Sequence, residues 1–316
     1  MTVDLRTTYL GIPLANPLIA SSSPLTGTMD GLRRLEDAGV AAVVLPSVFE
    51  EQISNESDEP ERRLELVAEA KETLGIPVLA SINGTSRGSW VRYARLLQEA
   101  GAHAVELNVY FLATEVEMTS TMVELQYLDL VEAVRGELSI PLSVKLGPYF
   151  NAFAHMADLV VRAGADGIVM FNRFYQPDID LDSGELRAAP SPSISQELRT
   201  ALRWIALLHK RVHASLAATG GIHGSSDALK VIAAGGNVAM MASALLIRGP
   251  DHIDKVLHGM RTWLDMNGYD ALSQLRGSLS HRICPDPGGL ERSMYIEAIT
   301  NSLKDPRDLS SFKAAE

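Results

Sequence analysis

Short apolar runs alternate along the chain with longer segments in which apolar residues recur every three or four positions. The runs are almost continuously hydrophobic, which is typical of strands covered on both faces. We expect these strands at Leu18–Ser21, Ala41–Ser47, Val78–Ile82, Ala104–Val109, Leu142–Leu146, Gly167–Phe171, Leu216–Thr219 and Val238–Ser243. The periodic segments predict amphipathic helices. These helices are expected at Met29–Ala38, Glu61–Thr73, Ser89–Ala100, Met122–Glu137, Ala152–Ala163, Glu197–His209, Asp227–Ala234 and Pro250–Asn267.

Eight strand–helix units in strict alternation predict an α/β fold, a (β/α)8 TIM barrel that occupies residues 1–316 as one domain. A doubly wound sheet is disfavoured because no G-x-G-x-x-G follows the first strand. Thr8–Asn16 predicts an N-terminal β-hairpin that closes the barrel floor, and the tail after Asn267 predicts two short C-terminal helices. Four helices are expected to end at a left-handed glycine cap. These glycines are Gly39, Gly101, Gly164 and Gly235.

Composition narrows the functional classes. The 316 residues carry a formal net charge of −11, which argues against nucleic-acid binding. Cys284 is the only cysteine, so the chain holds no internal disulfide, thiolate iron–sulfur cluster or cysteine-rich zinc site, and no residue spacing indicates another metal site. No apolar run approaches the roughly 20 residues of a membrane span, and the N-terminus lacks a signal-peptide pattern. We therefore expect a cytoplasmic protein with a small-molecule substrate.

Polar residues at the ends of the predicted strands mark a candidate site, because barrel active sites form at the carboxyl ends of the strands. Lys145 ends an apolar strand. It is expected to act as a fixed cation or as a Schiff-base nucleophile, the ordinary alternative being a lysine that reaches the surface. Asn108 and Asn172 end two further strands, and their amides suit a planar ligand with alternating N–H and C=O groups.

Small residues follow the last two strands, where barrels commonly bind phosphate. They are Gly220, Gly221, Ala242 and Ser243. A tight turn alone is the alternative interpretation of the glycine pair, and its position after the seventh strand favours the phosphate site. Ser21 and Ser22, after the first strand, bring hydroxyl groups to the same end of the barrel.

Taken in order, several short motifs resemble the FMN-dependent dihydroorotate dehydrogenase family, over about residues 8 to 267. The motifs are Asn16–Ser21, Glu106–Asn108, Ser143–Leu146, Thr219–Ile222 and Ala242–Ser243. Phe49–Ile53 and Asn172–Asp180 are most similar to a soluble, dihydroorotate dehydrogenase-like branch.

The resemblance implies FMN as cofactor and oxidation of dihydroorotate to orotate in pyrimidine biosynthesis. It places the FMN phosphate on Gly220, Gly221, Ala242 and Ser243, and the isoalloxazine or ribityl group along Ser21 and Ser22. It places Asn108 against flavin or substrate, Lys145 at the pyrimidine end of the flavin, and Asn172 at the polar edge of the substrate. It also implies a homodimer, and allows a separate electron-transfer partner.

The chain departs from the family pattern on the substrate side. Phe111 stands where the family has a cysteine or serine base, and Ala113 where it has a substrate-binding asparagine. Phenylalanine cannot accept a proton, so Tyr110 and Ser120 on the same loop become the candidate catalytic residues beside Lys145. Three alternatives stay open: a flavin oxidoreductase with a different small substrate, a Schiff-base lyase or aldolase using Lys145, and a non-catalytic FMN-binding protein.

Overall fold

Eight parallel strands form a closed barrel, which confirms the predicted fold. The structure is a computed structural model that describes residues 3–55, 57–174, 177–187, 191–282 and 284–304. Each strand pairs in parallel with the next along the chain, and β13 returns to pair with β3, which closes the ring. The strands are β3 (Leu18–Ala20), β4 (Ala42–Val44), β6 (Val78–Asn83), β7 (Ala104–Asn108), β8 (Leu142–Leu146), β9 (Gly167–Met170), β12 (Ser215–Thr219) and β13 (Val238–Met241).

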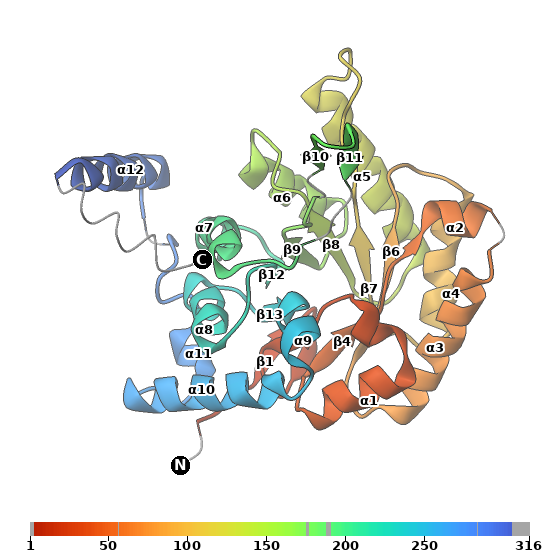
Figure 1. Ribbon diagram of the computed structural model, residues 1–316, viewed down its shortest axis with the longest axis horizontal. Coiled ribbons are helices and arrows are strands. Elements are labelled where there is room, and N and C mark those ends of the chain that lie inside the picture. Colours follow the sequence, from red (N-terminus) through yellow and green to blue (C-terminus); the bar gives the residue numbers. More distant parts are fainter. Residues whose placement is uncertain (1–2, 56, 175–176, 188–190, 283, 305–316) are drawn as a thin grey trace.

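Eight helices surround the barrel in the order that the sequence predicts (Figure 1). They are α1 (Met29–Asp37), α3 (Glu59–Thr73), α4 (Tyr93–Glu99), α5 (Ser120–Glu137), α6 (Phe153–Arg162), α7 (Leu198–Leu208), α8 (Ser225–Ala234) and α10 (His252–Met266). The main hydrophobic core lies between these helices and the outer face of the strands. All four predicted cap glycines have positive φ, between 92° and 119°.

The N-terminal hairpin closes the floor of the barrel, as predicted. It consists of β1 (Thr7–Tyr9) and β2 (Ile12–Leu14). Tyr9 is 1% exposed and belongs to a second apolar cluster, formed with inward-facing side chains of the strands. The hairpin is bound to the far end of the chain, because the Leu10 amide donates to Ser215 Oγ at 2.9 Å and Thr7 Oγ1 donates to the Asn237 carbonyl at 3.0 Å.

Additional short elements lie in the connections that follow the strands. We call this end of the barrel, where the strands terminate, the mouth. Strand β5 (Val48–Phe49) and helix α2 (Glu50–Ser54) follow β4, and a hairpin of β10 (Asp178–Asp180) and β11 (Glu185–Arg187) lies in the connection from β9 to α7. Helix α9 (Ser243–Arg248) follows β13. The 3-10 turns η1 (Pro24–Gly27), η2 (Ser89–Arg92) and η3 (Ser195–Glu197) precede α1, α4 and α7.

The C-terminal segment differs in part from the expected pair of short helices. Helix α11 (Leu272–Leu275) is short and packs on the barrel floor beside the N-terminal segment, where the Leu272 amide donates to the Asp4 carbonyl at 2.8 Å. Helix α12 (Pro287–Lys304) has 18 residues and stands to one side of the barrel (dark blue in Figure 1). Among the described helices, none combines the length and apolarity needed to cross a membrane.

Candidate active site at the mouth of the barrel

Strand register brings three of the polar strand ends side by side. In the parallel ladder, Asn83 of β6 is the partner of Asn108 of β7, and Asn108 is the partner of Lys145 of β8. Because side chains alternate between the two faces of a strand, the residues two positions earlier form a second row deeper in the barrel. That row contains Glu106 of β7, the ladder partner of Ser143 of β8.

Lys145 and Glu106 form an ion pair inside the barrel. Lys145 Nζ lies 3.1 Å from Glu106 Oε1, and the two side chains are 9% and 0% exposed. Glu106 Oε2 is buried and has no hydrogen-bond partner among the described residues. The interior of such a barrel is usually filled with branched apolar side chains. A charged pair at this depth therefore points to a role for the lysine at the mouth, with the glutamate as its fixed counter-charge.

The carboxylate of Glu106 also faces the barrel floor. Burial, and then the negative charge of Glu106, raise the pKa of the Tyr9 hydroxyl far above its usual value. Tyr9 comes from the N-terminal hairpin, so the hairpin places this hydroxyl within electrostatic reach of the carboxylate that pairs with Lys145. The sequence pointed to Lys145 but not to its partner, which lies on the neighbouring strand 39 residues away.

The two predicted amides meet at the mouth. Asn172 Nδ2 donates to Asn108 Oδ1 at 2.7 Å and to the Val109 carbonyl at 3.2 Å. Both asparagines line a cavity of about 790 Å³, together with Tyr110 and Gly220. Asn83, which the sequence analysis did not select, lines the same cavity and is 7% exposed. A cavity of this volume is typical of a small-molecule site.

The loop after β7 brings only one of three relevant side chains, Tyr110, Phe111 and Ser120, to the cavity. Tyr110 is on the cavity wall, with its ring stacked on Phe174 at 4.5 Å between centroids. Phe111, at the position of the family's base, packs against the main core instead. Ser120 is exposed on the first turn of α5 and is absent from the cavity lining. The structure therefore brings Tyr110, but not Ser120, to the candidate site.

The glycine pair after β12 forms a turn that requires glycine. Gly220 and Gly221 have φ of +84° and +71°, a region that other residues rarely adopt. A Cβ on Gly221 would lie 2.6 Å from the Leu198 nitrogen, whereas a Cβ on Gly220 would meet no atom within 4 Å. Gly221 is thus needed for close packing, and Gly220 faces the open cavity.

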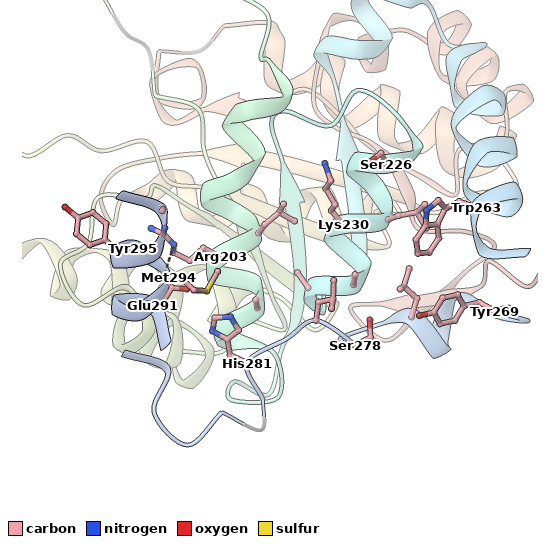
Figure 2. A pocket seen from close by; sticks show the side chains of 18 residues that line it. Arg203, Ser226, Lys230, Trp263, Tyr269, Ser278, His281, Glu291, Met294 and Tyr295 are labelled. Carbon is pink, nitrogen blue, oxygen red and sulfur yellow. Dashed lines mark ion pairs between the residues drawn. The ribbon is translucent and has the colours of Figure 1, made fainter. Parts of the chain in front are cut away.

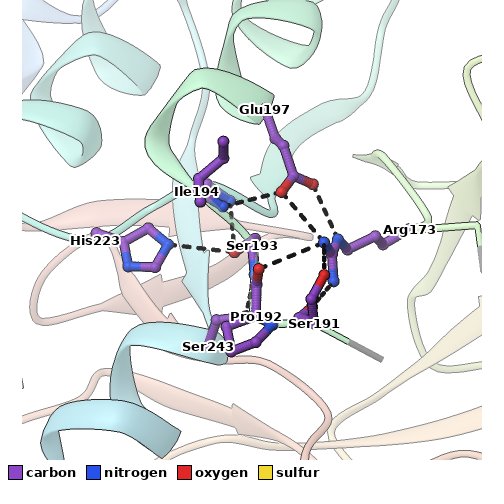
Figure 3. A network of polar contacts seen from close by, with 9 residues as sticks. Arg173, Ser191, Pro192, Ser193, Ile194, Glu197, His223 and Ser243 are labelled. Carbon is purple, nitrogen blue, oxygen red and sulfur yellow. Dashed lines mark hydrogen bonds and ion pairs between the residues drawn. The ribbon is translucent and has the colours of Figure 1, made fainter. Parts of the chain in front are cut away.

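Ser193 connects the ends of β12 and β13, a role that the sequence did not indicate. Figure 3 shows the contact between its side chain and His223. The Gly221 amide donates to Ser193 Oγ at 3.1 Å, the Ser193 amide donates to Ser243 Oγ at 3.0 Å, and His223 Nε2 lies 3.3 Å from Ser193 Oγ. Ser243 and Gly221, predicted together as a phosphate site, are therefore brought together around this serine.

An ion pair holds the segment that carries Ser193. Arg173 Nε lies 2.9 Å from Glu197 Oε2, and its guanidinium also donates to the Ser191 carbonyl (Figure 3). Arg173 and Glu197 line the mouth cavity. Both side chains are more than one-third exposed, so the pair fixes geometry more than it adds stability.

The remaining predicted residues lie at the mouth outside the cavity lining. Ser21 is 3% exposed, and its amide donates to the Met241 carbonyl at 2.8 Å. Ser22 is half-buried beside it, and Ala242 precedes the first residue of α9. Lys145 and Gly221 are likewise absent from the lining, although each adjoins a residue that belongs to it. Among the described residues, no group of three acidic, histidine or cysteine side chains forms a metal site.

The fold and site define a (β/α)8 barrel protein with a buried cation, convergent amides and a glycine turn at its mouth. The family model for dihydroorotate dehydrogenase matches residues 50–264. The chain therefore belongs to the dihydroorotate dehydrogenase family, whose members are flavoproteins. This confirms the resemblance found in the sequence motifs.

Curated relatives carry two different activities in their names. The chain is 26% identical to the NAD-dependent dihydropyrimidine dehydrogenase subunit PreA of Escherichia coli, over 94% of this chain and 81% of that protein. It is 25% identical to the catalytic subunit of dihydroorotate dehydrogenase B (NAD(+)) of Thermoplasma acidophilum, over 87% of this chain and 98% of that protein. Both relatives are named as dehydrogenases, but the names give different substrates: a dihydropyrimidine for one and dihydroorotate for the other.

Proposed function

We propose that the protein is an FMN-dependent oxidoreductase that acts on a CH–CH bond of a small cyclic amide, with dihydroorotate as the first candidate substrate. The observation that carries this proposal is the Lys145–Glu106 ion pair at the inner edge of the mouth. A cation fixed at that depth favours negative charge on a bound ligand. The proposal locates the reaction in the cavity of about 790 Å³.

The residues at the mouth fit FMN. Gly220 leaves open space where a side chain would stand, so a ligand can approach its backbone closely. Gly221, Ala242 and Ser243 lie beside it and would hold the phosphate, with Ser21 and Ser22 along the ribityl or ring. The Asn108 amide and the Lys145 ammonium offer the donors that the polar edge of a flavin accepts. FMN, when bound here, supplies the acceptor for hydride from the substrate.

The protein's own side chains bind and orient the substrate. Asn172 is held at one end by Asn108 and Val109, so its amide keeps one orientation at the cavity wall. Its carbonyl oxygen accepts from a ring N–H, while Asn83 and Asn108 offer further amide groups. Such a constellation recognises a ring with alternating N–H and C=O groups, as in a dihydropyrimidine.

Tyr110 is the strongest candidate for moving the substrate proton. It lines the cavity, while Phe111 packs on the core and Ser120 is exposed. Stacking on Phe174 orients its ring. The phenol oxygen of Tyr110 would take the place of the family's cysteine or serine. The proposal includes a cytoplasmic location, a homodimer and an electron-transfer partner for the reduced flavin.

A Schiff-base lyase is the weaker alternative. That chemistry requires a lysine amine that is free to attack a carbonyl, whereas Lys145 Nζ is engaged in an ion pair with Glu106 at 3.1 Å. The non-catalytic alternative depends on the missing base, which Tyr110 can replace. Both alternatives predict that no reducing substrate bleaches a bound flavin.

The visible spectrum tests the proposal. We expect the purified protein to show flavin absorption, and anaerobic dihydroorotate to bleach it. Dihydrouracil, which lacks the carboxylate, is the matched second substrate. Bleaching by dihydrouracil alone would retain the reaction class and replace the substrate. Flavin absorption that neither compound bleaches would exclude both substrates, and colourless protein that cannot be reconstituted with FMN would overturn the proposal. Borohydride trapping of a carbonyl compound on Lys145 would then favour the lyase.

A further inference from the structure

Helix α12 exposes apolar side chains around much of its circumference. Tyr295, Ile296 and Ile299 are 56%, 51% and 44% exposed, and Met294, on another side of the helix, is 54% exposed. A helix that is hydrophobic on most sides is normally buried. The family model matches residues 50–264, and α12 follows that range along the chain. This helix therefore presents a surface that the barrel does not cover.

The barrel beside α12 is also incompletely filled. A cavity of about 750 Å³ lies between α12 and helices α7, α8 and α10, and Figure 2 shows its walls. The walls are mostly apolar and include Trp263 and Met294. The one ion pair across it within the described residues joins Arg203 of α7 to Glu291 of α12 at 3.1 Å. The helix thus lies against its own barrel without filling the groove beside it.

The charges on the two surfaces are complementary. The groove side carries Arg203 and Lys230, and Lys230 is exposed. Helix α12 carries Glu291 and Glu297, and also Arg292, whose guanidinium lies 5.5 Å from the centroid of the Tyr295 ring. Within the described part of the chain, Glu291 pairs with Arg203, whereas neither Lys230 nor Glu297 forms an ion pair. Lys230 in the groove of one molecule and Glu297 on the helix of another could therefore form an ion pair between the two molecules.

We propose that α12 and this groove form the interface with a second copy of the chain. In this arrangement the α12 helices of the two copies lie side by side across the groove openings. Glu297 of each copy faces Lys230 of the other, and Ile296 and Ile299 are buried between the helices. The proposal rests on the surface alone and does not require the proposed flavin chemistry.

The available area is sufficient for such a dimer. A standard interface buries about 800 Å² on each partner. An 18-residue helix is about 27 Å long and about 10 Å wide, so half of its surface supplies roughly 400 Å². The rest has to come from the rim of the groove. Trp263 and Leu279, which line the groove, are 41% and 73% exposed, and Met266, three residues after Trp263 on α10, is 80% exposed. Aromatic and methionine side chains are enriched at interfaces.

The oligomeric state of the full chain is the first test. We expect a dimer by light scattering at micromolar concentration, and at least a tenfold weaker dimer in Ile296→Asp. Leu125→Asp is the matched control, since Leu125 is a 60% exposed leucine on the distant helix α5. A monomeric wild-type protein would overturn the proposal. An equal effect of the two variants, or no effect of Ile296→Asp, would place the interface elsewhere and overturn it as well.

Charge reversal distinguishes contact between copies from contact within one copy. Lys230→Glu and Glu297→Lys each place like charges at both contacts, so each variant alone should dimerise about tenfold more weakly. Mixing the two variants should restore dimerisation, because every contact in the mixed dimer then joins opposite charges. Restoration on mixing supports the proposal. Weakened variants that stay weak on mixing would overturn it, because a contact within one chain cannot be repaired by another chain.

Discussion

The two sides of the barrel mouth are built differently. The side to which we assign the FMN phosphate, here called the cofactor side, consists of the turns after β12 and β13, with Gly220, Gly221 and Ser243. Its contacts join backbone amides to serine hydroxyls. The loop side consists of the connections after β7 and β9, with Tyr110 and Arg173, and its contacts are made by side chains. On the cofactor side a single Cβ would collide with backbone. On the loop side residues 112–117 are exposed.

This difference suits the two sides to different tasks in the proposed function: the turns to binding the cofactor, and the loops to carrying the reacting side chains. A backbone turn tolerates few residue types, so a chain that loses it loses the ligand. A loop carried on the same barrel can exchange its side chains at little cost to the fold. The sequence resemblance accordingly assigns the FMN phosphate to the glycine turn, which the chain has, and the base to a position that holds Phe111. The predictions below probe this separation in order of decreasing effect.

The largest effect is expected from Lys145→Met. The substitution leaves Glu106 as an unpaired charge that is 0% exposed, which costs about 3–5 kcal/mol of the free energy of unfolding. Adding Glu106→Gln should recover most of the loss, because no buried charge is then left. Urea unfolding of the two single variants and the double variant measures the coupling. Additive losses in the double variant would show that the two side chains act independently.

The next largest effect concerns the glycine turn. Gly221→Ala should lower stability by about 2–3 kcal/mol, because it combines a positive φ with a backbone collision. Gly220→Ala is the internal control, with the same backbone strain of about 1–2 kcal/mol and no collision. Its added methyl group enters the cavity, so it should reduce the flavin content more than the stability. Flavin absorbance per chain and urea midpoints separate the two effects, and equal stability losses would contradict the distinction.

A smaller effect is expected from Asn172→Ala. The variant removes the amide that donates to Asn108 Oδ1 and to the Val109 carbonyl, and with it the oxygen that is proposed to accept from the substrate. Loss of that substrate contact should weaken substrate binding by about 1–2 kcal/mol. The KM for the substrate that bleaches the flavin should rise about tenfold, while the Kd for FMN stays within about threefold. A comparable loss of FMN affinity would move Asn172 from the substrate to the cofactor.

The smallest effect is expected from Glu197→Gln on the loop side. Because Arg173 and Glu197 are partly exposed, the pair contributes at most about 1 kcal/mol to stability. Loss of the ion pair should loosen the segment that carries Ser193 and speed limited proteolysis there, with little change in the urea midpoint. A drop in stability as large as that of Gly221→Ala would remove the distinction between the two sides.

The sequence predicts the barrel better than it predicts the site. Burial on both faces makes the strands uniformly apolar, so their positions can be recognised without knowing their neighbours. The partners of site residues depend on strand register and loop path, which periodicity does not encode. Glu106 pairs with Lys145 from 39 residues away, and Ser193 binds Ser243 from 50 residues away. Phe111 shows the same limit, since its packing on the core leaves the cavity wall to Tyr110.

The N-terminal hairpin has a consequence for how the chain is made. Its acceptor at Asn237 lies 230 residues beyond Thr7, and its other acceptor, at Ser215, lies 205 residues beyond Leu10. At a synthesis rate of about 5–20 residues per second, the hairpin waits roughly 10–45 s for the synthesis of the strands that receive it. Tyr9 and Leu14 are exposed to water during that time. A molecular chaperone that recognises this apolar hairpin would therefore meet it before the barrel exists.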